Sequence, residues 1–273
     1  MIMGVYDMVK KMHPDSQVFG FLMGPHGIFS NNYIEITDEY MDLYRNMGGF
    51  DMICSGRHKI ETEEQFSNSL KNVEALGLSG LIVIGGDDSN TNACLLAEYF
   101  KKSGGNCTVI GCPKTIDGDL KNEYIEVSFG FETATKTFSE AIGNIAIDAL
   151  SSKLYYYFIR LMGRSASHIA LECALQTRIN YTLIGEEVQA KGMTLYQITQ
   201  DLADMICKRA KLNKNYGVVL VPEGLIEFIP EIKTLIGEIN EILSKEHNPE
   251  TIKDFVLHHL TYQSKALFTF LPR

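Results

Sequence analysis

The chain has 273 residues, of which 45% are hydrophobic and 22% are charged, and its formal net charge is −9. This balance is typical of a globular protein and excludes a disordered chain, a collagen-like repeat and a membrane-spanning apolar run. The length predicts one large domain or two modest ones. Because the chain is acidic, neither nucleic acid nor an anionic membrane is expected as a partner, and any phosphate-binding site must be local.

Short apolar runs rich in β-forming residues alternate with segments whose apolar residues recur every three to four positions. The predicted strands are 17–23, 50–54, 81–84, 108–112, 155–161, 181–184 and 218–221. The predicted helices are 61–76, 89–102, 132–150, 165–176, 194–211 and 230–244. Alternation of this kind predicts an α/β fold of mostly parallel sheets flanked by helices, with ligands beyond the carboxyl ends of the strands. We expect a domain change near residue 145.

The strongest local signal is GGDDS, which follows the predicted strand 81–84. Gly85 and Gly86 allow a tight turn, and a helix predicted from Ser89 would direct its N–H groups and positive dipole at an anion. Asp87 can then hold a divalent metal, directly or through water, that bridges to phosphate oxygens. The alternative is that Asp87 and Asp88 only cap the helix.

The second signal is GCPKTIDGDL, directly after the predicted strand 108–112. Asp117 and Asp119 lie two residues apart, so one can accept a proton from a hydroxyl while the other positions metal or water. Lys114 is a compact cation suited to phosphate oxygens. A turn that merely builds the loop is the alternative, but two acidic loops after successive strands favour a functional site.

Two further strands end in polar residues. Arg164 in MGRSASH lies before a helix that we expect Ser165 to cap, where its guanidinium suits a sugar phosphate; a solvated surface arginine is the alternative. Glu223 in VPEG can accept hydrogen bonds from a sugar hydroxyl, or it is a surface loop residue.

In this order, GGDDS, PKTIDGD, MGRSASH and VPEG resemble the pyrophosphate-dependent branch of the phosphofructokinase family. SGRHKIETEEQ and GFLMGPHGI add to the resemblance, which runs from about residue 19 to about residue 243 and has Met23 where the family usually has Gly. It implies a two-domain phosphofructokinase-like architecture, with a metal- and pyrophosphate-binding domain at 1–145 and a sugar-phosphate-binding domain at 146–273. The implied reaction transfers phosphoryl from pyrophosphate to the 1-hydroxyl of fructose 6-phosphate, giving fructose 1,6-bisphosphate and phosphate in glycolysis or gluconeogenesis. A Mg²⁺ cofactor and a homo-oligomer, a dimer or larger, are implied as well.

The resemblance also assigns roles to residues. Asp87 is expected to hold the metal, Asp117 to act as the base, and Lys114 to neutralise charge on pyrophosphate. Asp88 replaces a glycine of ATP-using members and would repel nucleotide, while Asp119 would orient the metal or Asp117.

The remaining implied contacts are to the two substrates. The expected sugar-phosphate contacts are Thr115, Ile116, Asp117, Tyr155, Met162, Gly163, Arg164 and Glu223. The expected pyrophosphate contacts are Gly86, Arg57 and Lys114. In the family a Lys-Tyr pair near Tyr155 reaches the neighbouring subunit's substrate, and here Leu154 stands where the lysine would be.

Three alternatives stay open at this point: an ATP-dependent 6-phosphofructokinase, a non-catalytic fragment or subunit that binds a metabolite or a partner chain, and a nicotinamide-binding domain. The last is disfavoured because GGDDSN lacks the third glycine of that fingerprint. The family's opening GGPAPGIN-like turn and its later GYEGR-like segment have no counterpart, so we expect the chain to correspond to the middle of a longer enzyme. The absence of paired cysteine motifs and of a secretory signal favours reduced thiols and a cytoplasmic protein.

Overall fold

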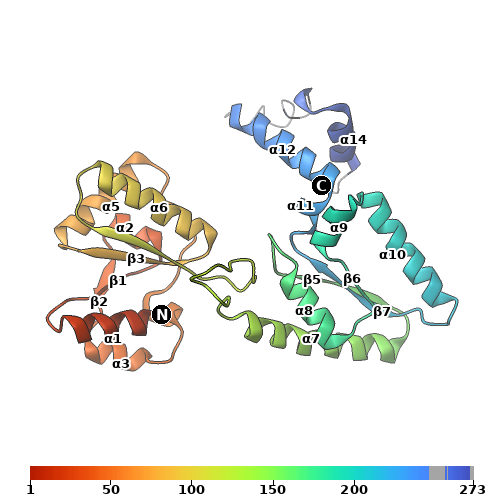
Figure 1. The fold of residues 1–273 in the computed structure, drawn as a ribbon, viewed down its shortest axis with the longest axis horizontal. Coiled ribbons are helices and arrows are strands. Elements are labelled where there is room, and N and C mark those ends of the chain that lie inside the picture. The colour runs from red at the N-terminus through yellow and green to blue at the C-terminus, as the bar shows by residue number, and fades with distance from the viewer. Residues whose placement is uncertain (246–255, 257, 271–273) are drawn as a thin grey trace. The chain divides into compact units, whose positions relative to one another are not determined.

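The computed structural model describes residues 1–245, 256 and 258–270, which form two compact units, Met1–Lys114 and Thr115–Arg273 (Figure 1). The division falls earlier than the expected boundary near residue 145. The reason is α7 (Phe131–Ser152), whose Ile142 is buried against Ile169 and Leu220 of the second unit. The α/β architecture with helices flanking parallel strands is confirmed in both units. The division of functions between 1–145 and 146–273 remains a prediction.

Unit 1 begins with a small layer of short elements. They are α1 (Ile2–Met12), β1 (Phe19–Phe21), α2 (Pro25–Ser30), β2 (Tyr33–Glu35), α3 (Asp38–Tyr44) and α4 (Gly49–Ile53). β1 and β2 pair antiparallel, and Tyr6, Met41 and Met52 form the core of this layer. The predicted strand 50–54 is wrong, because the segment is helical and Met52 turns inward as the one buried side chain of that turn.

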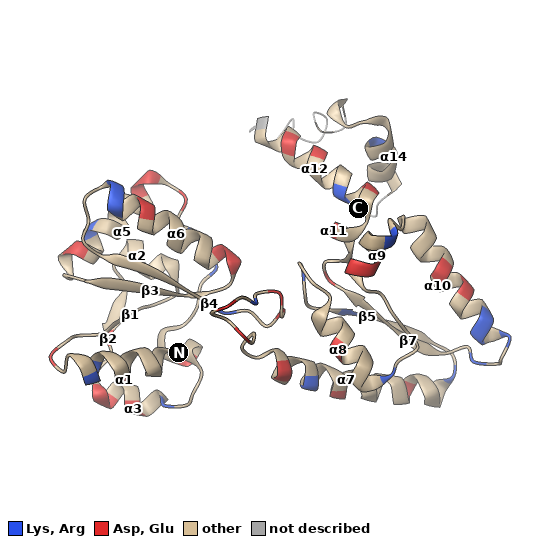
Figure 2. Cartoon of the chain, viewed as in Figure 1, with Lys and Arg blue, Asp and Glu red and all other residues tan. Residues whose placement is uncertain are grey.

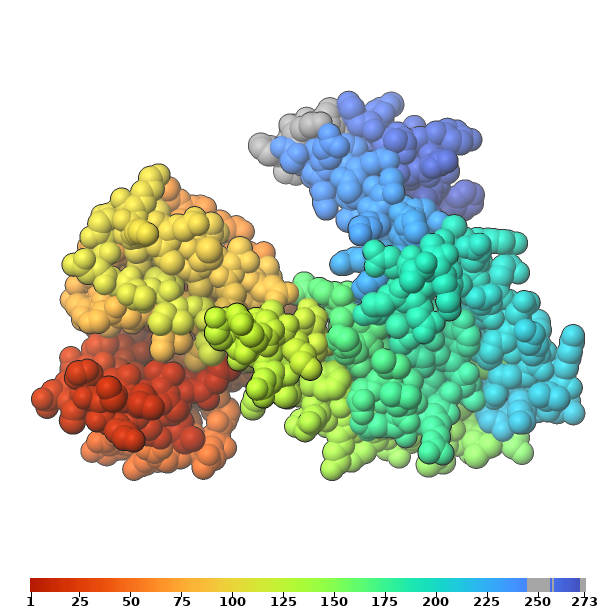
Figure 3. All heavy atoms as spheres, in the orientation of Figure 1, coloured from red at the N-terminus to blue at the C-terminus, as the bar shows by residue number. Residues whose placement is uncertain are grey.

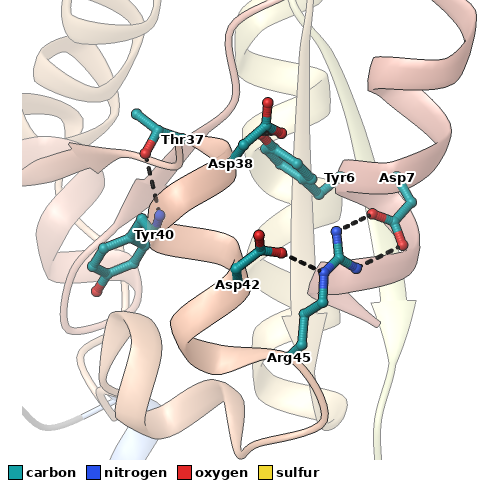
Figure 4. Close-up of polar contacts among 7 residues, drawn as sticks. All are labelled: Tyr6, Asp7, Thr37, Asp38, Tyr40, Asp42 and Arg45. Atoms are coloured by element: carbon teal, nitrogen blue, oxygen red, sulfur yellow. Dashed lines mark hydrogen bonds and ion pairs between the residues drawn. The ribbon is translucent and has the colours of Figure 1, made fainter.

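A polar network holds α1 against α3 (Figure 4). The Tyr6 hydroxyl donates a 2.6 Å hydrogen bond to Asp38, and burial together with that carboxylate raises the pKa of Tyr6 to about 12. The Arg45 guanidinium donates to both carboxylate oxygens of Asp7, at 3.1 and 3.0 Å, and its Nε donates to Asp42 at 2.8 Å. The paired geometry on Asp7 fixes the orientation of the two helices.

The rest of unit 1 contains α5 (Glu63–Ala75), β3 (Gly80–Gly85), α6 (Asp87–Lys102) and β4 (Thr108–Pro113). α5 starts at a reciprocal cap in which Thr62 and Gln65 bond each other's backbone N–H groups. β3 and β4 pair parallel, with Gly85 opposite Pro113, and their inward side chains pack with Val73, Leu96 and Phe100. These elements confirm the predicted strands 81–84 and 108–112 and the predicted helix 61–76.

Unit 2 consists of α7 and a parallel sheet with its covering helices. Its elements after α7 are β5 (Tyr156–Leu161), α8 (His168–Thr177), β6 (Tyr181–Thr182), α9 (Gly185–Lys191), α10 (Leu195–Ala210), β7 (Gly217–Pro222), α11 (Leu225–Phe228), α12 (Pro230–Lys245) and α14 (Tyr262–Phe270). β7 lies between β5 and β6 and pairs parallel with both (Figure 1). One buried cluster joins the sheet to α7 and α8, and a second joins it to α9, α10 and α11.

Two predicted helix starts need correction. The helix expected from Ser89 begins at Asp87, because carboxylates in a first turn are stabilised by the helix dipole. The helix expected to be capped by Ser165 begins at His168, after a turn around Gly163. Of the helices that the structure describes, none combines the length and apolar character needed to cross a membrane.

The segment between β4 and α7 lies at the surface of unit 2 and is drawn in yellow-green in Figure 3. Its loop is closed by Asn122, whose side chain accepts hydrogen bonds from the backbone N–H groups of Tyr124 and Ile125. Large apolar side chains of this loop are solvent-exposed, with Tyr124 at 87% and Phe129 at 77%. The exposed part of this loop therefore contributes little to the core, whereas Ile116 at its start packs against the buried cluster of α7 and α8.

Candidate functional site

The carboxyl ends of β3 and β4 bring Gly86 and Lys114 together. The Lys114 N–H donates a 2.7 Å hydrogen bond to the Gly85 carbonyl, which continues the parallel pairing beyond Gly85 and Pro113. A methyl group built on Gly86 would lie 3.8 Å from the Lys114 carbonyl, so the two backbones are near neighbours. The Lys114 side chain is exposed at this edge, which we call the β3–β4 edge and define as residues 85–88 and 114.

The same edge carries the first turn of α6. Asp87 and Asp88 are the first two residues of the helix, both exposed, and Figure 2 shows the acidic start of α6 beyond β3. The side-chain amide of Asn90 donates to the carbonyls of Gly85 and Gly86 at 2.8 and 2.9 Å, which fixes the turn before the helix. The helix therefore starts in a fixed place, with two carboxylates and the N–H groups of its first turn at its end.

The SGRHKI and GFLMGPHGI segments lie against each other in unit 1. A methyl group on Gly56 would come within 2.1 Å of the Met23 carbonyl, so only glycine fits there. Met23 and Gly24 both have positive φ, at 61° and 65°, which bends the chain around this contact. Arg57 follows directly and has an exposed side chain.

Sequence reasoning did not identify Lys59 as a functional residue. Its ammonium nitrogen lies 3.4 Å from Asp88, so the SGRHKI segment reaches the β3–β4 edge through an ion pair. The signal that could have found it was the run of basic residues at 57–59 inside a motif already singled out.

In unit 2 the carboxyl ends of β5 and β7 are joined by backbone contacts. The N–H groups of Glu223 and Gly224 donate to the carbonyls of Leu161 and Gly163 at 2.8 and 3.0 Å. A methyl group on Gly224 would lie 1.7 Å from the Arg164 carbonyl, so MGR and VPEG touch along their backbones. We call residues 162–164 and 223–224 the β5–β7 edge; the side chains of Met162, Arg164 and Glu223 are exposed there.

Residues 115–119 lie at the beginnings of α7 and α8. Gly118 has φ +79°, and a methyl group there would meet Phe131 and His168 at 3.2 and 3.3 Å. The Asp117 N–H donates to the Thr115 hydroxyl at 3.2 Å, and Ile116 packs beside the start of α7 at Gly130.

Asp119 belongs to the same turn. Its Oδ1 is buried and has no hydrogen-bond partner among the residues that the structure describes. Burying a carboxylate oxygen without a hydrogen bond costs free energy, and a hydrogen-bond donor or a cation that contacts Asp119 Oδ1 would remove that cost.

Tyr155 does not join these groups. It precedes β5, so it lies at the opposite end of that strand from residues 162–164, about 20 Å away for six extended residues. The ring is 57% exposed and packs edge-on against Tyr157, with 6.4 Å between ring centroids. Any ligand that Tyr155 contacts is therefore separate from one held at the β5–β7 edge of the same chain.

Ser167 and Glu186 join the segments that follow β5 and β6 in the chain and were not found from the sequence. The buried Ser167 hydroxyl accepts a 2.9 Å hydrogen bond from the Gly185 N–H, and the Ser167 N–H donates to Glu186 at 2.9 Å. Burial acts to raise the pKa of Glu186, but the hydrogen bonds from Ser167 and the nearby His168 outweigh it and hold that pKa below its usual value. Both contacts join the start of α8 to the start of α9, a pairing that only the tertiary fold creates.

Metal binding was tested against the side chains present. Across residues 1–245, 256 and 258–270, no three His, Cys, Asp or Glu side chains cluster in a way that could hold a metal ion. Mg²⁺ at phosphoryl-transfer sites commonly takes one or two carboxylates and completes its shell with phosphate oxygens and water. An exposed Asp87 beside helix N–H groups can supply the one carboxylate that such a Mg²⁺ site needs from the protein.

These observations define an α/β protein whose charged and glycine-rich loops follow the carboxyl ends of parallel strands, where such folds bind ligands. The phosphofructokinase family model matches residues 1–264, and the chain belongs to the phosphofructokinase family.

Relatives and solved structures agree with the family. The chain is 56% identical over 271 residues to pyrophosphate–fructose 6-phosphate 1-phosphotransferase subunit beta of Ricinus communis, covering 99% of this chain and 49% of the relative. It is 55% identical over 278 residues to pyrophosphate–fructose 6-phosphate 1-phosphotransferase of Treponema pallidum, covering 99% and 48%. The pyrophosphate-dependent phosphofructokinase of Nitrosospira multiformis superposes with a TM-score of 0.65 at 20% identity, covering 82% of this chain and 56% of that one, which supports the fold. The chain thus spans about half the length of the curated relatives it matches.

Proposed function

We propose that this chain carries the substrate-binding and catalytic loops of a pyrophosphate-dependent phosphofructokinase. The reaction would transfer phosphoryl from pyrophosphate to the 1-hydroxyl of fructose 6-phosphate. The observation that carries the proposal is the backbone hydrogen bond from the Lys114 N–H to the Gly85 carbonyl, because it brings a cationic residue to the strand edge where α6 begins. A cation and helix N–H groups at one edge suit a short anionic donor. The printed names of the relatives from Ricinus communis and Treponema pallidum support the same donor and acceptor.

Donor binding is assigned to unit 1. Lys114 and Arg57 neutralise pyrophosphate oxygens, and the Gly86 N–H donates a hydrogen bond to them. Asp88 disfavours the longer, more highly charged ATP by repulsion. Asp87 would hold Mg²⁺, which when bound would neutralise charge on the donor oxygens.

Sugar binding is assigned to unit 2. Arg164 contacts the sugar phosphate and Glu223 accepts hydrogen bonds from sugar hydroxyls, while Met162 and Gly163 shape the loop. Asp117 accepts the proton of the sugar 1-hydroxyl as that hydroxyl oxygen attacks the donor phosphorus in line and phosphate leaves. Asp119 orients Asp117 or a bound water, because its buried Oδ1 can still accept a hydrogen bond.

Cellular context is part of the same proposal. All six cysteines are free thiols, which favours a reducing compartment such as the cytoplasm. The Ricinus communis relative is named as a subunit, which supports an oligomer, and exposed Tyr155 is available to reach a neighbouring copy.

The reaction can be followed by ³¹P NMR with fructose 6-phosphate, Mg²⁺ and either pyrophosphate or ATP. We expect fructose 1,6-bisphosphate to form with pyrophosphate, and Asp117→Asn to lower turnover by about 10²–10⁴-fold while fructose 6-phosphate still binds. Asp201→Asn, an exposed aspartate on α10, is the matched control and should leave turnover unchanged.

Other outcomes separate the alternatives. Faster turnover with ATP would contradict the donor assignment and favour an ATP-dependent 6-phosphofructokinase. Binding of fructose 6-phosphate without turnover on either donor would favour the non-catalytic fragment or subunit.

A further inference from the structure

Residues 59 and 60 are attached to α6 at two points one helical turn apart. The Ile60 N–H donates to the Asn92 side-chain carbonyl at 3.0 Å, and the Asn92 amide donates back to the Ile60 carbonyl at 2.8 Å. Lys59 then pairs with Asp88, four residues before Asn92 and on the same face of the helix. Because Ile60 is fully buried and Asn92 is 7% exposed, the first attachment is rigid and fixes where the Lys59 side chain begins.

The other side of the loop is fixed as well. Gly56 lies so close to the Met23 carbonyl that a methyl group would come within 2.1 Å of it. Residues 57–59 therefore lie between two fixed points. Lys59 reaches the acidic start of α6, whereas the His58 ring packs against His26 with 5.2 Å between ring centroids.

Asp88 creates an electrostatic problem that Lys59 can solve. With Asp87, it places two carboxylates at the edge where pyrophosphate, itself an anion, would bind. A carboxylate left unpaired about 4 Å from a phosphate repels it even at the dielectric constant of water. The Lys59 ammonium at 3.4 Å offsets the charge of Asp88 and draws its carboxylate toward the SGRHKI segment.

We propose that Lys59 is a positioning residue for the phosphoryl donor. It acts through Asp88, because it holds that carboxylate and offsets its charge so that pyrophosphate can bind at the β3–β4 edge. The inference rests on the proposed function of the β3–β4 edge. It assigns a role to a residue whose ion pair is exposed and therefore adds little to the stability of the fold, with Lys59 and Asp88 side chains 50% and 70% exposed.

A double-mutant cycle on the full chain tests the proposal, with pyrophosphate and Mg²⁺ titrated by calorimetry. Lys59→Met should raise the Kd for pyrophosphate about five- to tenfold, because the Asp88 charge is no longer offset. In an Asp88→Asn background, Lys59→Met should change the Kd less than about twofold, since the charge it offsets is gone. Lys59→Arg should keep the Kd within about twofold of the unsubstituted chain.

The matched control is Lys191→Met, which breaks a comparable exposed pair with Glu187 at 3.1 Å in unit 2. It should leave the Kd for pyrophosphate unchanged, and both lysine variants should keep the urea midpoint of the unsubstituted chain. A full effect of Lys59→Met in the Asp88→Asn background would overturn the positioning role, because Lys59 would then act on the donor directly. An unchanged Kd for Lys59→Met would overturn any role of Lys59, whereas failure of the unsubstituted chain to bind pyrophosphate would overturn the proposed function itself.

Discussion

The β3–β4 edge and the β5–β7 edge occupy the same place in their units but are built differently. Each has backbone hydrogen bonds and exposed charged side chains. At the first, Asp88 forms an ion pair with Lys59, and a methyl group on Gly86 would have 3.8 Å of room. At the second, Glu223 and Gly224 bond to Leu161 and Gly163, and the backbones are so close that a methyl group on Gly224 would lie 1.7 Å from the Arg164 carbonyl. A charge change should therefore alter ligand choice at the first edge, while added bulk should disrupt the fold at the second.

The largest expected effect comes from adding a single methyl group at the second edge. Gly224→Ala places that methyl 1.7 Å from the Arg164 carbonyl, so the backbone must move, and we expect a loss of about 3 kcal/mol in the free energy of unfolding. Gly86→Ala is the matched change at the first edge. Its nearest neighbour would be 3.8 Å away, and it should cost less than about 1 kcal/mol. Equal urea midpoints for the two variants would contradict the tighter backbone packing of the β5–β7 edge.

The next effect concerns charge at the β3–β4 edge. Lys114→Met should raise the Kd for pyrophosphate about tenfold, because a cation at the end of β4 is lost, while the Kd for fructose 6-phosphate stays unchanged. Calorimetric titration of each ligand checks both halves of this prediction. Lys121→Met, an exposed lysine of unit 2, is the control. An equal rise in the Kd values for pyrophosphate and fructose 6-phosphate would mean that Lys114 affects the structure generally and does not bind the donor specifically.

A smaller change is expected when Asp88 is replaced by glycine. The loss of one negative charge should improve the use of ATP relative to pyrophosphate about fivefold, since two charges at about 4 Å in water repel by roughly 1 kcal/mol. Full conversion should need Lys114 changed as well. Side-by-side kinetics with the two donors measure the ratio, and an unchanged ratio would mean that Asp88 does not select the donor.

The smallest effect is a pH dependence of unit 2, where Glu186 accepts a hydrogen bond from Ser167 just after the β5–β7 edge. Because the pKa of Glu186 is lowered in the folded state, its ionised form contributes stability that is present above the unfolded pKa of about 4.3 and is lost as pH falls through the lower folded value. Glu186→Gln should therefore flatten the loss of stability below about pH 4.3. Glu227→Gln, which changes an exposed glutamate of α11, is the control for the removal of one carboxylate in unit 2. Identical acid unfolding curves for the two variants would contradict this role of Ser167 and Glu186.

Much of the fold could be predicted from periodicity, and the errors have identifiable causes. Strands 81–84, 108–112, 155–161 and 218–221 were found because each is a short run rich in apolar and β-forming residues. Such a run does not distinguish strand from helix when it is short, which is why 50–54 was predicted as a strand and is the helix α4. β2 escaped because a three-residue strand has too little alternation to detect.

The motifs of the candidate site could be predicted from the sequence, but the contacts between them could not. The motifs indicated which loops follow which strands, because local sequence sets strand ends and helix starts. The contact of Gly224 with Arg164 and the ion pair of Lys59 with Asp88 join segments far apart in the chain, so no local pattern contains them. The roles assigned to Asp117, Arg164 and Glu223 stay predictions until ligand binding is measured.

The strand order of unit 2 has a consequence for how the protein folds. β7 lies between β5 and β6, so Tyr156 pairs with Gly217 and Tyr181 with Val219. Earlier strands must wait for residues 217–222 to be synthesised, and the pairing must overcome the entropy of closing a long intervening loop. Glu223 and Gly224 follow β7 directly, so the sheet and the loop proposed to contact the sugar are completed in one step. A ligand held there would bind only the assembled sheet and would shift the folding equilibrium toward it.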